Sequence, residues 1–143
     1  MSDFSVRKAT QADLDAIKEL ADSHRHELGF VLRPALSRSI SREELLVAEN
    51  HARVIGFIEY HHRQDERTTL YHIAVTPDHR NSGVGRELID ALRAEASALG
   101  KDVIRLKCPA DLPARLFYEH IGFHSIGEES GKDRSLIVFV LTV

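Results

Sequence analysis

The sequence predicts a mixed α/β fold, in which helices cover both faces of a sheet that has antiparallel and parallel parts. Two observations favour this class. The closely spaced strand-like segments 44–49, 54–62 and 68–75 suit an antiparallel meander. The strand–helix–strand order over 68–108 suits a parallel crossover. The whole predicted order is β-α-α-β-β-β-α-β-α-β-β, in one domain over residues 1–143.

The first half of the chain begins with a predicted strand over 4–9, and a helix over 11–23 follows it. Thr10 suits the N-cap of that helix, and Asp13 fits a capping box three residues later. The apolar residues of this helix recur at helical spacing: Leu14, Ile17, Leu20 and Ala21. A second helix is expected within 24–42, because apolar residues lie four apart there, at Leu32, Leu36 and Ile40.

The second half of the chain contains a long predicted helix over 84–99. It ends at Gly100, a residue that suits the left-handed position after a helix. The side chains expected to be buried along one face of this helix are Val84, Leu88, Ala91, Leu92, Leu99 and the stem of Glu95. Another helix opens at Pro113 and ends at Gly122. The remaining strands are predicted over 103–108, 123–128 and 135–142.

The composition is that of an ordinary soluble globular chain. Nineteen Lys and Arg against 22 Asp and Glu give a net charge of −3, so the broad positive field that nucleic-acid binding requires is absent. The longest apolar run, residues 136–141, is far shorter than the roughly 20 residues of a membrane span. Residues 1–3 resemble no secretion signal. We therefore expect a cytoplasmic protein without nucleic-acid or membrane partners.

Cysteine and histidine usage argues against a metal centre. One cysteine, Cys108, excludes an internal disulfide and a Cys-rich zinc site, and we expect it to be a small core residue. Nine histidines are present, but His24 with His26 and the adjacent His61 and His62 lack a set of partner ligands at metal-binding spacing. We expect no metal.

The most informative segment is the loop between the strand ending at Val75 and the helix starting at Val84. Its glycines, Gly83 and Gly85, remove side chains that would hold a phosphate away from the free backbone N–H groups of a helix N-terminus. A plain strand-to-helix turn that uses glycine for its shape would look the same. A dinucleotide fingerprint is excluded because it needs a small residue at Leu88, and a P-loop is excluded by Gly85-Arg86-Glu87.

Two motifs in this chain resemble the GNAT superfamily of N-acetyltransferases. Arg80-x-x-Gly83-x-Gly85, after a strand ending Ile73-Ala74-Val75, is similar to the family's acetyl-CoA motif. The second motif is similar to the family's pattern Asn-x-x-Ala-x-x-aliphatic-Tyr-x-x-x-Gly-Phe and reads Asp111-x-x-Ala114-x-x-Phe117-Tyr118-x-x-Ile121-Gly122-Phe123. With the opening residues 6–14, the resemblance follows chain order over nearly all of the sequence.

The resemblance implies acetyl-CoA as cosubstrate and assigns its binding residues. It places the pyrophosphate on the amides of Arg80, Asn81, Ser82, Gly83, Val84, Gly85 and Arg86, and the pantetheine arm along Ile73, Ala74 and Val75. The second motif adds Asp111, Ala114, Phe117 and Tyr118. Asp111 stands where the family usually has Asn, so contact with the cofactor is less secure there, and an N-cap role is the safer interpretation.

The resemblance also implies direct transfer of an acetyl group to an amine, without an acyl-enzyme. Tyr118 is then the expected hydrogen-bond donor to the departing thiolate. The family's base is expected on the strand face that carries Thr69 and Tyr71, neither of which is a good base. In the simplest hairpin register Glu59 and His61 share that face, so they are the candidates for a proton relay through water. His72 has the opposite parity and is expected to pack against a helix.

The acceptor is left open by the sequence. A primary amine on a small molecule, peptide or protein fits the resemblance, and a non-catalytic acyl-CoA-binding sensor is the alternative. Residues 24–42 carry four arginines against Glu27 alone, at Arg25, Arg33, Arg38 and Arg42, which suits either an acidic acceptor or a merely solvated loop. A homodimer through the closing strands is also left open.

Overall fold

The computed structural model describes residues 3–143, so Met1 and Ser2, used above to argue against a secretion signal, lie outside the described residues. Within 3–143 no helix has both the length and the apolar character needed to span a membrane. The strands are β1 (Ser5–Lys8), β2 (Leu45–Asn50), β3 (Arg53–His62), β4 (Arg67–Val75), β5 (Val103–Pro109), β6 (His124–Ser130) and β7 (Ser135–Thr142). The α-helices are α1 (Leu14–Ser23), α2 (Arg25–Leu28), α3 (Arg33–Ser41), α4 (Val84–Ala98) and α5 (Ala114–Ile121).

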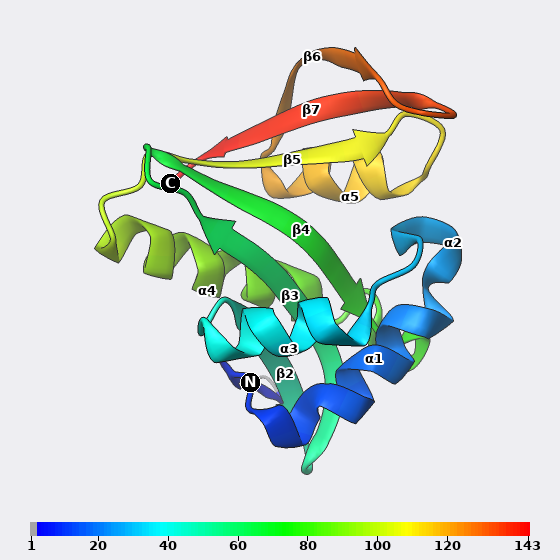
Figure 1. Ribbon diagram of the computed structural model, residues 1–143, viewed down its shortest axis with the longest axis vertical. Helices are drawn as coiled ribbons and strands as arrows, with labels where there is room; N and C mark the ends of the chain where they lie inside the picture. Colours follow the sequence, from blue (N-terminus) through cyan, green and yellow to red (C-terminus); the bar gives the residue numbers. More distant parts are fainter. Residues whose placement is uncertain (1–2) are drawn as a thin grey trace. The chain divides into compact units, whose positions relative to one another are not determined.

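This element order confirms the predicted one, apart from the additional short helix α2. In residues 3–143, hydrogen bonding joins seven strands in the order β1-β2-β3-β4-β5-β7-β6 (Figure 1). The pairs β1–β2, β2–β3, β5–β7 and β6–β7 are antiparallel, whereas β4 and β5 are parallel. The sheet is therefore mixed, as predicted. The chain divides into two compact units, one of residues 1–61 and 70–92 and the other of 62–69 and 93–143.

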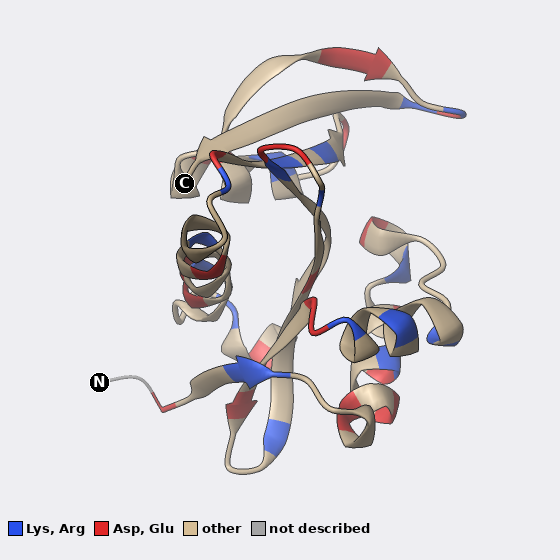
Figure 2. Cartoon of the chain, turned by 60° about the vertical axis from the view of Figure 1, so that its left-hand side comes forward, with Lys and Arg blue, Asp and Glu red and all other residues tan. Residues whose placement is uncertain are grey.

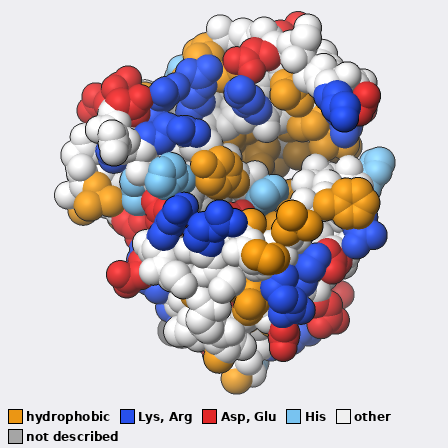
Figure 3. Space-filling view, viewed as in Figure 1, with side chains coloured by type: hydrophobic (Ala, Val, Ile, Leu, Met, Phe, Trp, Pro, Cys, Tyr) orange, Lys and Arg blue, Asp and Glu red, His pale blue; other side chains and the backbone are white. Residues whose placement is uncertain are grey.

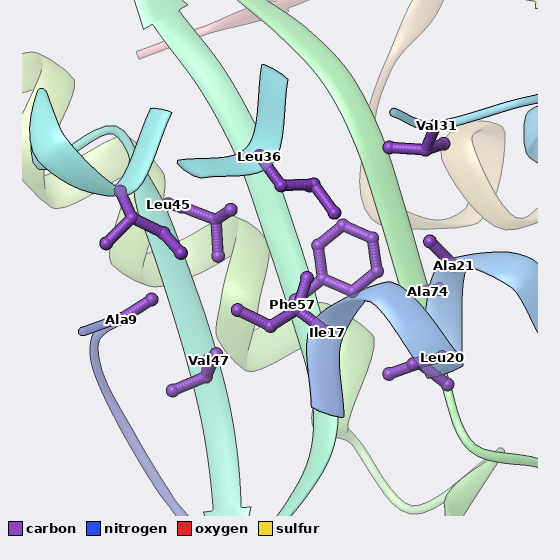
Figure 4. Packing of buried hydrophobic residues seen from close by; sticks show 11 residues of the cluster. Ala9, Ile17, Leu20, Ala21, Val31, Leu36, Leu45, Val47, Phe57 and Ala74 are labelled. Atoms are coloured by element: carbon purple, nitrogen blue, oxygen red, sulfur yellow. The ribbon is translucent and has the colours of Figure 1, made fainter. Parts of the chain in front are cut away.

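The first unit has a hydrophobic core between its strands and the helices α1 and α3. Figure 4 shows Ile17 and Leu20 of α1, Leu36 of α3 and Phe57 of β3 gathered there. The helix α1 begins after a short 3-10 turn, where the carboxylate of Asp13 accepts the backbone N–H of Thr10 at 2.7 Å. This bond confirms the predicted capping contact, and the same carboxylate also pairs with Arg7.

The helix α4 covers the opposite face of these strands. A Cβ added at Gly56 would lie 3.2 Å from Cγ1 of Val84 and 3.4 Å from Cδ1 of Leu88, so the helix packs directly on the β3 backbone at this point. Phe57, the next residue, faces the core formed with α1 and α3, because successive side chains alternate across a strand. Helices therefore cover both faces of the sheet in this unit, as predicted. The burial expected for Leu99 is wrong, because its side chain is 57% exposed beyond the end of α4.

The β3–β4 hairpin contains one more residue on β4 than on β3. The N–H of Arg63 donates to the carbonyl of Arg67 near the turn, and the N–H of Thr76 donates to the carbonyl of Ile55 at the other end. The chain takes eight steps from Ile55 to Arg63 but nine from Arg67 to Thr76. Such a β-bulge reverses the side of the strand on which all later side chains lie.

The second unit places β7 between β5 and β6, with α5 against β5. Ring contacts join Tyr118 of α5 to Phe123 and Phe139, at centroid separations of 5.6 and 6.1 Å. Gly122 ends α5 with φ +123°, a conformation that a side chain would strain. Cys108 is buried and unoxidised in β5, which confirms the prediction of a core residue.

Candidate functional site

The loop before α4 takes a conformation that leaves its backbone accessible. Asn81 and Gly83 have φ angles of +61° and +88°, in the left-handed region that favours glycine. Nothing lies within 4 Å of the position that a Cβ on Gly83 would occupy, so this residue borders open space. A ligand can therefore approach the loop backbone at Gly83.

The start of α4 presents backbone N–H groups that lack helical partners. The N–H of Glu87 donates to the carbonyl of Gly83 at 3.0 Å, which makes this the first bond of the helix. The three preceding N–H groups, on Val84, Gly85 and Arg86, consequently have no carbonyl within the helix to bind. Together with the positive end of the helix dipole, they form an arrangement that suits a phosphate.

A buried histidine connects this loop to the end of β4. His24 is 7% exposed, and its Nε2 lies 3.1 Å from the carbonyl oxygen of Val75 and 2.9 Å from Nη2 of Arg80. Its Nδ1 lies 2.9 Å from the carbonyl of Leu20 in α1. The imidazole thus contacts two of the residues assigned by sequence to cofactor binding. From the sequence, His24 was a candidate only as a metal ligand, because nothing local in the sequence indicates these long-range contacts.

The edge of β4 beyond Thr69 is not paired with β5. Among the described residues, the pairing of these two strands extends from Arg67 with Val103 to Thr69 with Arg105. Residues 73–75, expected to bind the pantetheine arm, lie in the part of β4 beyond this ladder. One carbonyl of that part, on Val75, is within hydrogen-bonding distance of His24.

A cavity of about 350 Å³ lies where α3 meets β3 and β4 in the first unit. Glu59 lines it, with a side chain only 5% exposed. The Oε1 atom of Glu59 lies 2.7 Å from Nδ1 of His72, and its Oε2 accepts the hydroxyl of Ser39 at 2.6 Å. Figure 3 shows basic and hydrophobic side chains next to one another on the face that carries α3.

The structure corrects the prediction for His72. Without the bulge in β4, Tyr71 would lie on the same face as Glu59 and His72 on the other face. With the bulge, His72 also reaches the face of Glu59, and both residues line the cavity. A carboxylate at Nδ1 favours the hydrogen on that nitrogen, and a neutral ring then has its lone pair at Nε2. Nε2 has no hydrogen-bond partner within residues 3–143. The arrangement can therefore accept a proton at Nε2.

The other candidates for the proton relay lie outside the cavity. His61 places its Nδ1 2.9 Å from Oε1 of Glu44, and neither residue lines the cavity. Thr69 accepts a hydrogen bond from Nε of Arg63 at 2.7 Å. Of the two bases selected by sequence, the structure brings only Glu59 to the cavity.

The second unit contains the remaining predicted site residues. Asp111 does not cap α5, because Pro113 is the N-cap residue, and its carboxylate instead pairs with Arg134 at 2.9 Å. The N-cap interpretation of Asp111 is therefore wrong. Tyr118 is 9% exposed and packs against the ring of Phe117 as well as the two phenylalanines named above. Ala114 lies at the start of the same helix.

Charged residues occur in both the helices and the strands of the described part of the chain. Figure 2 shows acidic and basic positions on most helices and strands, in keeping with the net charge of −3. Within the part of the chain that the structure describes, no three His, Cys, Asp or Glu side chains are grouped to hold a metal ion.

Comparison with known proteins identifies the family. Residues 41–125, more than half of the chain, match the model of the acetyltransferase (GNAT) domain. No curated protein matches the sequence. The fold is similar to Ard1 from Thermoplasma volcanium, with 19% identity, a TM-score of 0.88 and 99% of each chain covered.

Two further solved structures contain the coenzyme. PaiA N-acetyltransferase from Thermoplasma acidophilum, in complex with coenzyme A, is 20% identical, with a TM-score of 0.85 and 100% of each chain covered. The structure of yncA from Salmonella typhimurium, with its cofactor acetyl-CoA, is 21% identical, with a TM-score of 0.80, and covers 99% of this chain and 94% of that one. The chain therefore belongs to the GNAT family of acetyltransferases.

Proposed function

We propose that this protein transfers the acetyl group of acetyl-CoA to a primary amine, and that His72, held by Glu59, takes the proton from that amine. The observation that carries the proposal is the contact of 2.7 Å between Nδ1 of His72 and Oε1 of Glu59, two residues that line one cavity. His72 directly precedes the segment 73–75 that we propose binds the pantetheine arm. This adjacency supports an acceptor amine in the cavity close to the acetyl group.

Proton removal is the step for which a base is required. An amine with the usual lysine pKa of about 10.4 is almost fully protonated at pH 7, and freeing its lone pair costs about 4.6 kcal/mol. Nε2 of His72 is the acceptor we assign to this proton. Glu59 positions the ring by accepting the hydrogen of Nδ1, and it stabilises the positive charge that the ring gains. Ser39 in turn holds the second oxygen of Glu59.

The coenzyme fits the residues of the loop and of β4. Acetyl-CoA supplies the acetyl group as a reactive thioester. We assign its pyrophosphate to the N–H groups of Val84, Gly85 and Arg86 and to the loop residues Arg80, Asn81, Ser82 and Gly83. The free N–H groups at the start of α4 and the open space at Gly83 support this assignment. We retain Ala114, Phe117 and Asp111 as proposed contacts of the coenzyme from the second motif.

We assign Tyr118 as the donor to the departing sulfur. The amine nitrogen forms a bond to the thioester carbon and the carbon–sulfur bond breaks. The phenolic hydroxyl hydrogen-bonds the thiolate, which takes up the second proton that the nitrogen loses and leaves as the thiol. Such a charge-assisted bond contributes about 1.5–3 kcal/mol. We also propose that residues 1–143 act as one domain, which the end-to-end match to whole chains supports.

Thiol release tests the proposal. The protein is incubated with acetyl-CoA and a panel of polyamines, amino acids, aminoglycosides and short peptides, and free thiol is measured. We expect release with at least one acceptor class, and a Tyr118→Phe variant with much lower turnover but an unchanged dissociation constant for acetyl-CoA. Coenzyme binding without release on any amine would favour the non-catalytic acyl-CoA-binding alternative, and equal turnover of the variant would remove Tyr118 from the mechanism.

A further inference from the structure

The cavity at Glu59 and His72 has two arginines without counterions. Arg38 and Arg42 both line it, and neither makes a hydrogen bond or an ion pair with its side chain inside residues 3–143. Among the described residues that line the cavity, Glu59 is the acidic one, and its two oxygens contact His72 and Ser39. Neither arginine is therefore paired with a carboxylate within residues 3–143.

The other two arginines of this basic region are engaged elsewhere. Arg33 pairs with Asp15, and Arg25 pairs with Asp22 while its guanidinium stacks 4.8 Å from the ring centroid of Phe30. Neither of these arginines lines the cavity. Of the four arginines in residues 24–42, two are therefore in ion pairs away from the cavity, and the two without such partners line the cavity.

The spacing of the two unpaired arginines has an energetic cost. Arg38 lies in α3 and Arg42 is its C-cap residue, so the two are four residues apart on one face of the helix. Like charges at this spacing destabilise a helix by a few tenths of a kcal/mol. An anion bound between the two guanidinium groups would remove this repulsion and form charge-assisted hydrogen bonds with both.

The remaining wall of the cavity is apolar. Phe30, Leu32 and Tyr71 line it with side chains that are 77%, 63% and 46% exposed. Large hydrophobic side chains grouped at a cavity are typical of a ligand site, where the ligand covers them. The cavity thus has a histidine, a pair of arginines and an apolar wall. A ligand that matches them has an amine for His72, an anionic group for the arginines and an apolar group for the wall.

We propose that the acceptor of this enzyme is a small amine that carries an oxyanion, a carboxylate or a phosphate, which Arg38 and Arg42 bind together. This inference rests on the proposed function for the identity of the amine site. It predicts that amino acids are better acceptors than polyamines, because the two arginines repel a second positive charge.

Matched acceptors that differ only in the anion test the inference. We would compare kcat/KM by thiol release for L-phenylalanine against L-phenylalaninamide, and for O-phosphoethanolamine against ethanolamine. The two pairs distinguish a carboxylate from a phosphate. Because the amide also changes the basicity of the amine, the decisive quantity is how the preference within each pair changes between the wild type and the variants Arg38→Gln and Arg42→Gln.

We expect each variant to reduce the preference for the charged member of one pair about tenfold or more, as the loss of a charge-assisted bond implies. The variant Arg33→Gln is the matched control, since it removes an arginine of the same helix that lies outside the cavity, and it should keep the wild-type preference. A preference for the charged acceptor that is absent, or that survives both cavity variants, overturns the inference.

A binding measurement separates this inference from the proposed function. Calorimetric titration of the protein and coenzyme A with N-acetyl-L-phenylalanine and with N-acetyl-L-phenylalaninamide requires no turnover. If no amine releases thiol, the proposed function fails. The anion site is still supported if N-acetyl-L-phenylalanine binds more tightly than N-acetyl-L-phenylalaninamide, and if only Arg38→Gln and Arg42→Gln remove this difference in affinity. Equal binding of acid and amide overturns the anion site even if acetyl transfer to other amines is found.

Discussion

Replacing Glu59 by Gln is the sharpest test of the proposed base. The carboxylate accepts two hydrogen bonds, from Nδ1 of His72 at 2.7 Å and from the Ser39 hydroxyl at 2.6 Å. A glutamine keeps the shape but has a single carbonyl oxygen and an NH₂ group that cannot accept. One of the two donors therefore loses its acceptor, and the charge that stabilises protonated His72 is removed.

The size of the effect follows from this loss. A hydrogen bond to a charged group contributes about 1.5–3 kcal/mol, and each 1.36 kcal/mol corresponds to a factor of ten in rate. We therefore expect Glu59→Gln to lower kcat/KM for the acceptor by about 10- to 150-fold. The dissociation constant for coenzyme A, measured by calorimetry, should not change, because Glu59 does not lie in the loop before α4 to which the pyrophosphate is assigned.

Two controls decide whether the effect passes through His72. Glu44→Gln makes the same change in a carboxylate that faces His61 outside the cavity, at 2.9 Å, and it should leave the rate within a factor of two or three. In a double-mutant cycle, Glu59→Gln should add little to a His72→Gln variant, because both remove one interaction. Additive losses, or equal losses in the Glu44 and Glu59 variants, would refute the assignment.

Three further changes test the surrounding structure. Gly56→Ala should lower the free energy of unfolding by about 1–3 kcal/mol in urea titrations, because its Cβ would lie 3.1 Å from the carbonyl of Ala74; unchanged stability would contradict the close packing of α4. Asp13→Asn should cost about 2 kcal/mol at pH 7, since the hydrogen bonds from Arg7 hold the pKa of Asp13 below its ordinary value of 3.8. That stabilisation is present above the unfolded pKa and is lost as the pH falls through the lower folded pKa, so wild type and variant should converge in acid; a gap independent of pH would argue against it. Arg80→Gln should raise the dissociation constant of coenzyme A about tenfold or more in calorimetry, and an unaltered constant would exclude a phosphate contact.

The elements of the fold were predictable because their determinants are local. The spacing of Ile17 and Leu20 predicts α1, and the closely spaced strand-like segments 44–49 and 54–62 predict β2 and β3. Gly100 and Gly122 end their helices with positive φ, as expected from residues that tolerate this region. The glycines of the loop before α4 indicated a helix start with accessible N–H groups, although a plain strand-to-helix turn would have shown the same residues.

The contact of His72 with Glu59 could not be predicted because it depends on a single inserted residue. Counting from the hairpin turn places Tyr71 opposite Glu59, and this is correct only for a ladder without a bulge. The nine steps along β4 place His72 there instead. Nothing in the alternation of β4 marks the extra residue. The pairing of Asp111 with Arg134 was missed for a related reason, because the partner lies 23 residues away in a different element.

The contacts of His24 have a consequence for how the two parts of the proposed coenzyme site depend on each other. A neutral imidazole has one hydrogen. If it is on Nδ1, the ring donates to the Leu20 carbonyl and its Nε2 accepts from Arg80; if it is on Nε2, the ring donates to the Val75 carbonyl and can no longer accept from Arg80. The position of the hydrogen therefore decides whether His24 is hydrogen-bonded to the guanidinium of Arg80 or to the carbonyl of Val75. One proton on one buried ring determines which of these two groups is free to meet a ligand.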